Sequence, residues 1–268
     1  MDEMEFLLFF VFGFFTLRFL FKWYRALFGA WPKERYTLAR RVMGVLPIIA
    51  FFILLYTTVA LAAFDVVDSL FFIVFYLLMG FTWISCCMSL MGMGFDLSWQ
   101  DDALGLGNQA VVPAIAGGFI GLTLIYAGAN IGDGPGWWCV VFAAGLGLIA
   151  WLALGRITNS LTNVFERISV ERDAGCGMRF GCYLLASGII LGRASGGDWT
   201  SGYMTIVEFL TSFWPVLPLT LLVILVERYY ISRGHSDGDG DQSLASSAIW
   251  GAIYLLSMIV SVQMLPAI

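Results

Sequence analysis

The sequence predicts an all-α polytopic membrane protein, because 60% of its 268 residues are hydrophobic and only 12% are charged. A helix needs about 20 apolar residues to cross the core of a bilayer. Five sufficiently long stretches carry no charge: residues 42–64, 69–95, 103–132, 134–155 and 242–268. Three more contain one ionisable residue each: 6–21 with Arg18, 174–192 with Arg179 and 199–226 with Glu208. We therefore expect eight transmembrane helices in a single membrane domain, residues 1–268.

The basic residues predict the orientation of these helices. All Lys and Arg residues except Arg193 fall on one side of the predicted membrane, and such residues are retained on the cytoplasmic side. Residues 1–5 are acidic and lack the basic start of a cleavable signal peptide, so the first span is expected to remain. We expect a bacterial inner-membrane protein with both termini in the periplasm.

The first cytoplasmic loop, residues 23–41, is basic and rich in aromatic residues, among them Trp23 and Trp31. Such segments bind anionic lipid head groups at a membrane surface. We expect lipid contact here, with docking of a protein partner as the alternative. Nothing in the sequence resembles a basic surface for a nucleic-acid duplex, so no nucleic-acid partner is expected.

An internal repeat marks the start of two predicted outward-running helices. Residues 107–117 (GNQAVVPAIAG) align with residues 171–181 (ERDAGCGMRFG). The aligned pairs are Asn108 and Arg172, Ala110 and Ala174, and Gly117 and Gly181. Arg35 precedes Gly44 by nine residues and Gln242 precedes Gly251 by nine, which are weaker copies. The repeat predicts four two-helix units, residues 1–63, 64–131, 132–195 and 196–268, all in the same orientation.

Glycines spaced four apart, such as Gly117 with Gly121 and Gly177 with Gly181, let helix backbones approach closely in a membrane. Packing alone is one interpretation of this spacing. The other is that these helices line a central pathway or form an oligomer interface.

Residues 108–111 leading to Gly117 resemble the repeated element of the YjfL-like family of bacterial inner-membrane proteins, which is domain of unknown function 350. The resemblance is best over residues 68–195. It implies the two-helix unit and an association with envelope-stress or membrane-integrity systems. The family has no established activity, so the resemblance implies no catalytic residue.

The residues that several kinds of cofactor site and catalytic site require are missing from the sequence. His235 is the only histidine, which excludes bis-histidine haem within one chain, and the two lysines, Lys22 and Lys33, lie where neither can hold retinal in mid-membrane. The phosphate-binding, zinc-protease and serine-hydrolase motifs are missing, and the five cysteines form no C-x-x-C pair. We expect no enzyme activity, no cofactor and no metal site.

Glu208 is the strongest single candidate for a functional residue. Charges within a membrane are costly and usually face protein or water. An ion pair with Arg193 is the structural interpretation, and a proton or cation site is the functional one. Pro215 and Pro218 follow in the same span and predict that it breaks or bends.

The sequence therefore predicts a non-enzymatic subunit or scaffold that assembles through its glycine-bearing helices, as a homo-oligomer or with other membrane subunits. The alternative is a channel or transporter with a proton or cation path near Glu208.

Overall fold

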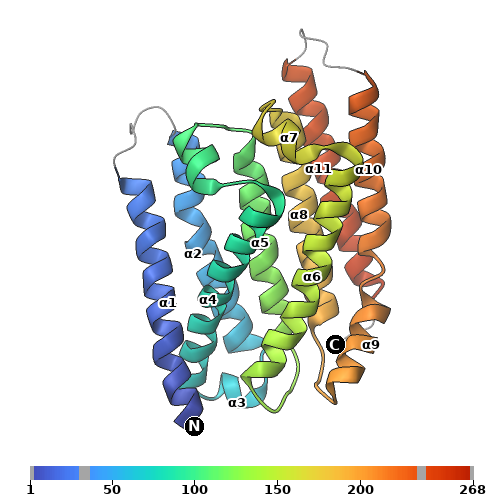
Figure 1. Ribbon diagram of the computed structural model, residues 1–268. Helices are drawn as coiled ribbons and strands as arrows, with labels where there is room; N and C mark the ends of the chain where they lie inside the picture. Colours follow the sequence, from blue (N-terminus) through green and yellow to red (C-terminus); the bar gives the residue numbers. More distant parts are fainter. Residues whose placement is uncertain (1–2, 30–36, 234–239, 266–268) are drawn as a thin grey trace.

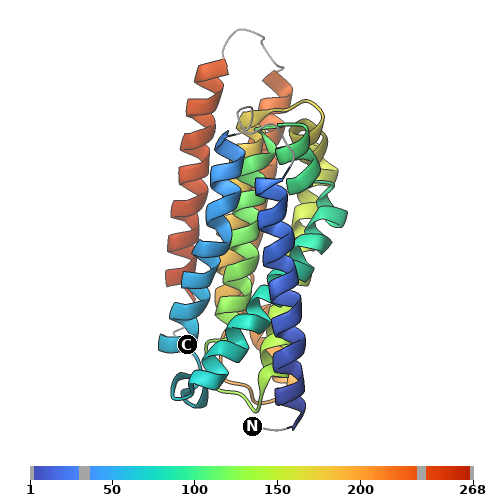
Figure 2. The same cartoon turned by 90° about the vertical axis from the view of Figure 1, so that its left-hand side faces the viewer.

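The computed structural model describes residues 3–29, 37–233 and 240–265. These residues form a bundle of helices that run roughly along one long axis (Figures 1 and 2). In chain order the elements are α1 (Glu3–Phe28), α2 (Thr37–Ala60), α3 (Phe64–Val67), α4 (Leu70–Phe95), the π-helix η1 (Trp99–Gly105), α5 (Val111–Ala129), α6 (Trp137–Thr162), α7 (Val164–Ser169), α8 (Ala174–Ser195), α9 (Gly202–Ser212), α10 (Val216–Arg233) and α11 (Gly240–Gln263).

Within the described residues, seven helices are long and apolar enough to cross a membrane: α1, α2, α4, α5, α6, α8 and α11. The pair α9 and α10 passes the same test only when taken together, with a bend of 45° between the two helices. The gap between them contains Pro215, as predicted, because proline lacks the backbone donor that would continue the helix. Pro218 is tolerated because it lies in the first turn of α10, where a helix has no use for that donor.

Helix boundaries differ from the predicted spans where polar side chains hydrogen-bond to the backbone. The helix in the predicted span 103–132 begins only at Val111, because the preceding residues belong to η1 and to the turn after it. Ser98 accepts a hydrogen bond from the amide of Asp101, and the amide of Ser98 donates to Asp102 at 2.7 Å. Asn108 then accepts a hydrogen bond from the amide of Ala110 at 3.0 Å, within the turn that precedes α5.

The glycine-bearing helices α5 and α8 form the centre of the bundle. In their most apolar stretches, 78% of the residues of α5 and 72% of those of α8 are buried, against 6% in α1 and 22% in α11. Helix α1 lies at the left edge of the bundle in Figure 1, and α11 lies at the left edge in Figure 2. The outer helices α1 and α11 therefore leave wide apolar faces exposed, as expected of helices that face lipid.

Backbone contact between α5 and α8 explains why glycine is needed there. A Cβ atom added to Gly117 would meet the carbonyl oxygen of Gly181, and one added to Gly128 would meet that of Gly192. A Cβ atom on Gly188 would likewise overlap the backbone of Gly121. The contacts advance in the same direction along both helices, so α5 and α8 are parallel. The predicted close contact of Gly117 and Gly181 with a neighbouring helix is confirmed.

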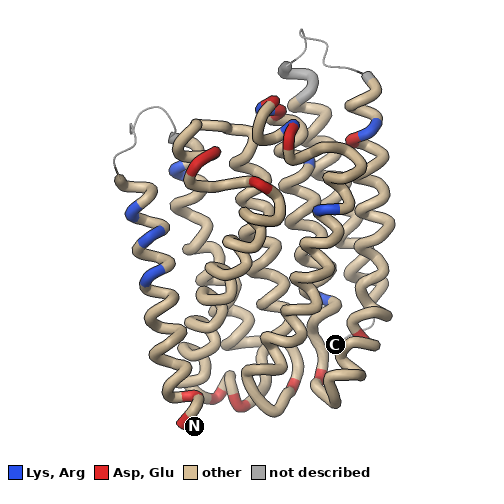
Figure 3. Tube along the Cα trace, in the orientation of Figure 1, with Lys and Arg blue, Asp and Glu red and all other residues tan. Residues whose placement is uncertain are grey.

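The two ends of the bundle differ in charge (Figure 3). Lys and Arg residues gather toward the end that carries α7, whereas acidic residues mark the end that carries α3. Arg193, in the last turn of α8, is a basic residue near the α3 end. Helix α1 begins, and α11 ends, toward the α3 end (Figure 1). This arrangement matches the predicted asymmetry of the loops.

The structure corrects one expectation for the first loop. Trp23 is fully buried, donates from Nε1 to the carbonyl oxygen of Met43 at 2.9 Å and stacks on Trp99 at 3.9 Å between ring centroids. It lies within α1, which continues to Phe28, so Trp23 packs the protein core and cannot contact head groups. Residues 30–36, including Trp31, lie outside the described part of the chain.

Candidate functional site

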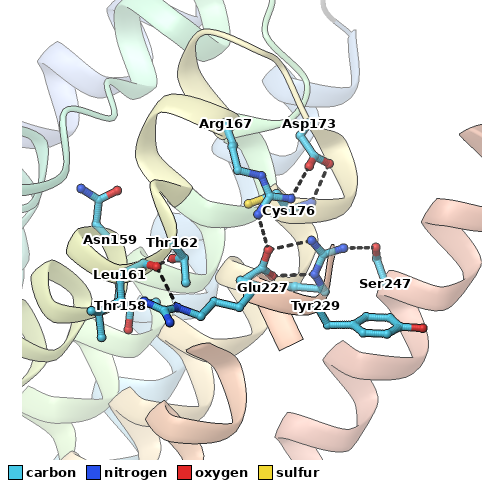
Figure 4. A network of polar contacts seen from close by, with 12 residues as sticks. Thr158, Asn159, Leu161, Thr162, Arg167, Asp173, Cys176, Glu227, Tyr229 and Ser247 are labelled. Atoms are coloured by element: carbon cyan, nitrogen blue, oxygen red, sulfur yellow. Dashed lines mark hydrogen bonds and ion pairs between the residues drawn. The ribbon is translucent and has the colours of Figure 1, made fainter. Parts of the chain in front are cut away.

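The most unusual feature of the structure is a carboxylate buried near the α7 end. Glu227 of α10 is 0% exposed, and two guanidinium groups surround it (Figure 4). Arg179 of α8 donates from Nε to Oε1 at 2.6 Å and from Nη2 to Oε2 at 2.8 Å. Arg167 of α7 donates from Nη1 to Oε2 at 2.7 Å. Glu227 thus accepts three hydrogen bonds between charged groups, which are stronger than those between neutral groups.

The contacts continue on both sides of this centre. Arg167 also donates from Nη2 to Asp173 at 2.7 Å, and Arg179 donates from Nη1 to the hydroxyl of Ser247 in α11 at 2.5 Å. We call these five residues the charge network: Arg167, Asp173, Arg179, Glu227 and Ser247. Two cations and two anions balance, which offsets much of the desolvation cost of burying them. The network joins α7, α8, α10 and α11.

Local backbone geometry brings Arg167 and Asp173 together. Asn163 (φ 50°) ends α6 in the left-handed conformation, and α7 follows immediately. Arg172 (φ 58°) turns the chain back, so that Asp173 can cap α8. The Asp173 carboxylate accepts a hydrogen bond from the amide of Cys176 at 2.9 Å. One carboxylate therefore starts α8 and also binds α7.

The pKa of Asp173 reflects this double contact. Burial alone would raise the pKa, but the amide of Cys176 and the guanidinium of Arg167 lower it below its ordinary value. The ionised form of Asp173 is therefore the one that the fold stabilises.

Arg179 has a further contact on its open face. Its guanidinium carbon lies 3.9 Å from the ring centroid of Tyr230, one turn after Glu227 in α10. A cation over a tyrosine ring is attracted by the negative face of the ring. Arg179 thus binds α10 twice, through Glu227 and through Tyr230.

Chemically, the charge network is a cross-link between elements. In the absence of either arginine, the buried carboxylate would keep only part of its counter-charge. The arrangement fixes the part of α10 that lies near the α7 end. The other end of α10 meets the bend that separates it from α9.

The two other predicted intramembrane ionisable residues do not form the expected pair. Glu208 is exposed on α9, so the expectation of a buried carboxylate is wrong. Arg193 is half-buried, and within the described part of the chain no ion pair joins it to Glu208. Glu208 instead lines a cavity of about 50 Å³ at the α3 end, together with Asp65, Asp133 and Asp198.

Among the repeat positions, Asn108 has a clear structural role. Its side chain is 1% exposed and donates from Nδ2 to the carbonyl oxygens of Ile168, at 2.8 Å, and Ser169, at 3.1 Å. Asn108 thereby ties the start of α5 to α7. Its aligned partner Arg172 is exposed and caps nothing; the residue that caps α8 is Asp173. Asp173 also contacts α7, through Arg167, so the residue that ties the start of α8 to α7 is one position later than the aligned Arg172.

The glycines of the repeat are packed against the backbone of another helix of the same chain. Gly121 faces the carbonyl oxygen of Leu184, and Gly181 faces that of Pro113. Ala110 presents its carbonyl oxygen to Gly177, while Ala174 is half-buried at the start of α8. These faces are already covered, so they cannot join separate chains, contrary to the expectation that assembly uses them.

Sequence reasoning missed Glu227, Arg167 and Asp173. Glu227 follows directly after the predicted span 199–226, so hydropathy alone places it outside the membrane. A signal was present: Arg179 lies within a predicted span and needs a counter-charge from another helix. Glu227 lies at the cytoplasmic end predicted for the next span, the same end as Arg179, so its carboxylate is a suitable counter-ion.

Comparisons with protein-family models, with curated proteins and with solved structures found no match to this chain.

Proposed function

We propose that the chain is a non-enzymatic, eight-span subunit or scaffold of a bacterial inner membrane, with α9 and α10 together forming one bent span. The observation that carries this proposal is the closed centre of the bundle. The backbones of α5 and α8 touch along Gly117, Gly121 and Gly128, which leaves no room for a route between these helices. A rigid, filled interior with widely exposed outer helices suits a structural role in a membrane.

The proposed orientation has the α7 end in the cytoplasm and both termini in the periplasm. The gathering of Lys and Arg at the α7 end supports it, because such residues are retained in the cytoplasm. An eighth span is supported by the combined length and hydropathy of α9 and α10.

The four-unit repeat is part of the proposal, and the middle two units support it best. Helices α4 and α6 both have 26 residues, and both end at a left-handed residue, Asp96 (φ 54°) and Asn163 (φ 50°). A short helix follows in each case, η1 or α7, and then a central glycine-bearing helix, α5 or α8. This parallel favours membership of the YjfL-like family, and with it a role in an envelope-stress or membrane-integrity system.

Assembly, as a homo-oligomer or with other membrane subunits, is proposed through the outer helices. The exposed face of α1 is rich in large apolar residues: Phe6, Leu7, Phe10, Phe14, Leu17 and Phe21. Helix packing in membranes depends on van der Waals contact, and such a face can pack against lipid or against a partner.

Purification of the full chain in a mild detergent, followed by native mass spectrometry, tests the proposal. We expect a complex of defined stoichiometry, and disruption of that complex by Phe14→Ala together with Leu17→Ala on the exposed face of α1. A single chain in several mild detergents and in lipid nanodiscs would contradict the role of subunit.

A channel or transporter with a proton or cation path near Glu208 remains the second candidate. It is favoured by the cavity at the α3 end, where four carboxylates, including Glu208, line the walls. Flux of protons and monovalent cations into proteoliposomes separates the two candidates. A flux that Glu208→Gln abolishes, while thermal stability is kept, would favour the transporter; the absence of flux above empty liposomes would favour the scaffold.

A further inference from the structure

A basic residue of the outer helix α1 faces away from the bundle at the depth of the membrane interior. Arg18 is exposed, and Figure 3 shows basic positions along this helix. Charged side chains within a membrane are costly, and they almost always face protein or water and pair with another polar group. Arg18 therefore requires a partner at this depth.

Contacts with α4 give the depth of Arg18. The hydroxyl oxygens of Thr16 and Thr82 lie 3.4 Å apart within a hydrogen bond, and Thr82 is in the middle of α4. Arg18 follows Thr16 by two residues, and it precedes Phe28, where α1 ends, by ten residues or about 15 Å. That distance is half of the hydrocarbon core, which is about 30 Å thick. Arg18 therefore lies close to the middle of the membrane.

The same contacts fix the side of α1 that faces outward. Thr16 is buried and donates from Oγ1 to the carbonyl oxygen of Leu78 in α4 at 2.9 Å. Arg18 lies about 200° further around the helix, so it points away from α4. Lys22 and Arg25 follow on the face of Arg18, nearer to the α7 end, where long basic side chains extend to the head groups. Arg18 is one turn deeper than Lys22.

The exposed face around Arg18 has the spacing of a helix–helix contact. Exposed residues occur along it at alternating intervals of four and three: Leu7, Val11, Phe14, Arg18, Phe21 and Arg25. This repeat keeps one stripe of a helix turned toward a partner helix over its whole length. A polar residue within such a stripe specifies the register of the two helices. The face is therefore suited to a second helix that supplies a group matching Arg18.

The described residues of this chain do not supply the counter-charge. Their ion pairs are those of the charge network, and Arg18 takes part in none of them. Away from the helix ends, the described spanning helices carry two carboxylates. Glu227 is enclosed by two arginines, and Glu208 lies toward the α3 end, where it lines the small cavity. A second copy in the same orientation would hold Glu208 nearer to the α3 end than Arg18.

We propose that α1 binds a transmembrane helix of a different protein, and that an acidic side chain at the middle of that helix pairs with Arg18. This inference rests on the proposed role of the chain as a membrane subunit, and it names the class of the partner. The apolar residues before and after Arg18 pack against the partner helix by van der Waals contact. The ion pair lowers the cost of placing Arg18 in hydrocarbon.

Designed transmembrane peptides test this pairing with the full chain. The chain carries a donor fluorophore in phosphatidylcholine liposomes, and the peptides are apolar helices of about 20 residues with an acceptor and a central Glu or Gln. Energy transfer at increasing ratios of peptide to lipid gives the affinity. We expect the Glu peptide to bind about tenfold more tightly than the Gln peptide, and a Glu placed about two turns nearer to either end to lose this preference.

Arg18 and Arg25 give a matched pair of variants. Both are exposed basic residues on the same face of α1, but Arg25 lies in its last turn. Arg18→Gln should bind the Glu and Gln peptides equally, whereas Arg25→Gln should keep the preference. Because both side chains are exposed, thermal unfolding of the two variants should match that of the unchanged chain.

Three results would overturn the inference. Equal binding of the two peptides to the unchanged chain would mean that Arg18 recognises no carboxylate. Loss of the preference on addition of phosphatidylglycerol would assign Arg18 to lipid phosphate. Dissociation of a homo-oligomer by Arg18→Gln, without peptide, would identify a second copy as the partner. Equal peptide binding together with a defined complex in native mass spectrometry would refute this inference alone and leave the subunit role intact.

Discussion

At the scale of single residues, Glu227 is the position on which the α7 end depends most. It satisfies two guanidinium groups that lie in other elements, with donor–acceptor distances of 2.6 to 2.8 Å. Removal of one partner from a buried ion pair costs more than removal of the whole pair, because a charge remains without compensation.

We expect Glu227→Gln to lower the free energy of unfolding by about 3–5 kcal/mol, the usual cost of breaking a buried pair. The measurement is thermal unfolding in detergent, followed by tryptophan fluorescence. Glu166→Gln is the control, since Glu166 is exposed on α7 and an exposed substitution changes stability by only about 0.5 kcal/mol or less. Equal stability of the two variants would refute the structural role of Glu227.

Asp173 makes the stability of the protein depend on pH. Its pKa in the folded protein lies below its ordinary value of 3.8, so the unfolded chain binds the proton more readily. The stabilisation by Asp173 is complete above that ordinary value and disappears as the pH falls through the lower pKa of the folded state.

Asp173→Asn should therefore reduce the unfolding temperature at neutral pH and have progressively less effect below about pH 4. Parallel unfolding curves of both proteins across this range measure the difference. Glu171→Gln, an exposed change two residues earlier, serves as control. A difference that grows on acidification would have the wrong sign for a carboxylate with a lowered pKa.

At the scale of elements, the contact of α5 with α8 and the bend between α9 and α10 have different origins. The contact needs glycine because backbone atoms occupy the space of a side chain. The bend needs the proline in the gap after α9 because a backbone donor is missing. Both features follow from local chemistry, and both could be predicted from the sequence.

Gly117→Ala should destabilise the α5–α8 pair by roughly 1–3 kcal/mol, the usual cost of overpacking, since the added Cβ would meet the backbone of Gly181. Gly145→Ala is the matched control: Gly145 is also inside a helix, but a Cβ there meets nothing within 4 Å. Thermal unfolding of both variants gives the comparison. A loss of stability in Gly145→Ala of the same size would show that the effect is not specific to the contact.

The charge network could not be predicted in the same way. Arg179 and Glu227 are 48 residues apart, and their contact depends on how α8 and α10 are rotated about their own axes. Hydropathy gives the position of a span along the chain but not the direction of each side chain around it. For the same reason, the exposed position of Glu208 on α9 could not be read from its depth in the span.

At the scale of the whole molecule, the class and the charge asymmetry follow from composition and from the loops. Long apolar stretches have few alternatives to helices in a membrane, because all backbone groups must be paired there. The sequence indicates the central helices less directly than it indicates the class. The spacing of the glycines nevertheless points to α5 and α8. The long apolar helices, their order and the central pair could thus be predicted from the sequence, whereas the geometry of the side-chain network could not.

The proposed topology predicts that a reporter fused after residue 268 lies in the periplasm. The reason is the basic α7 end, which should stay in the cytoplasm. An enzyme reporter active only in the periplasm measures this, and a fusion in the loop between α10 and α11 should give the opposite result. Cytoplasmic activity of the C-terminal fusion would require a different number of spans or the reverse orientation.

The distance along the chain between the members of the charge network affects the biosynthesis of the protein. Arg167 and Arg179 leave the ribosome long before Glu227, with 60 and 48 positions between them and the carboxylate. During synthesis, Asp173 is the only carboxylate of the charge network that is already present to compensate these two arginines. Until α10 is synthesised, Arg167 and Arg179 lack the carboxylate of Glu227, so the last pair of helices completes the folding of a unit that was translated before it.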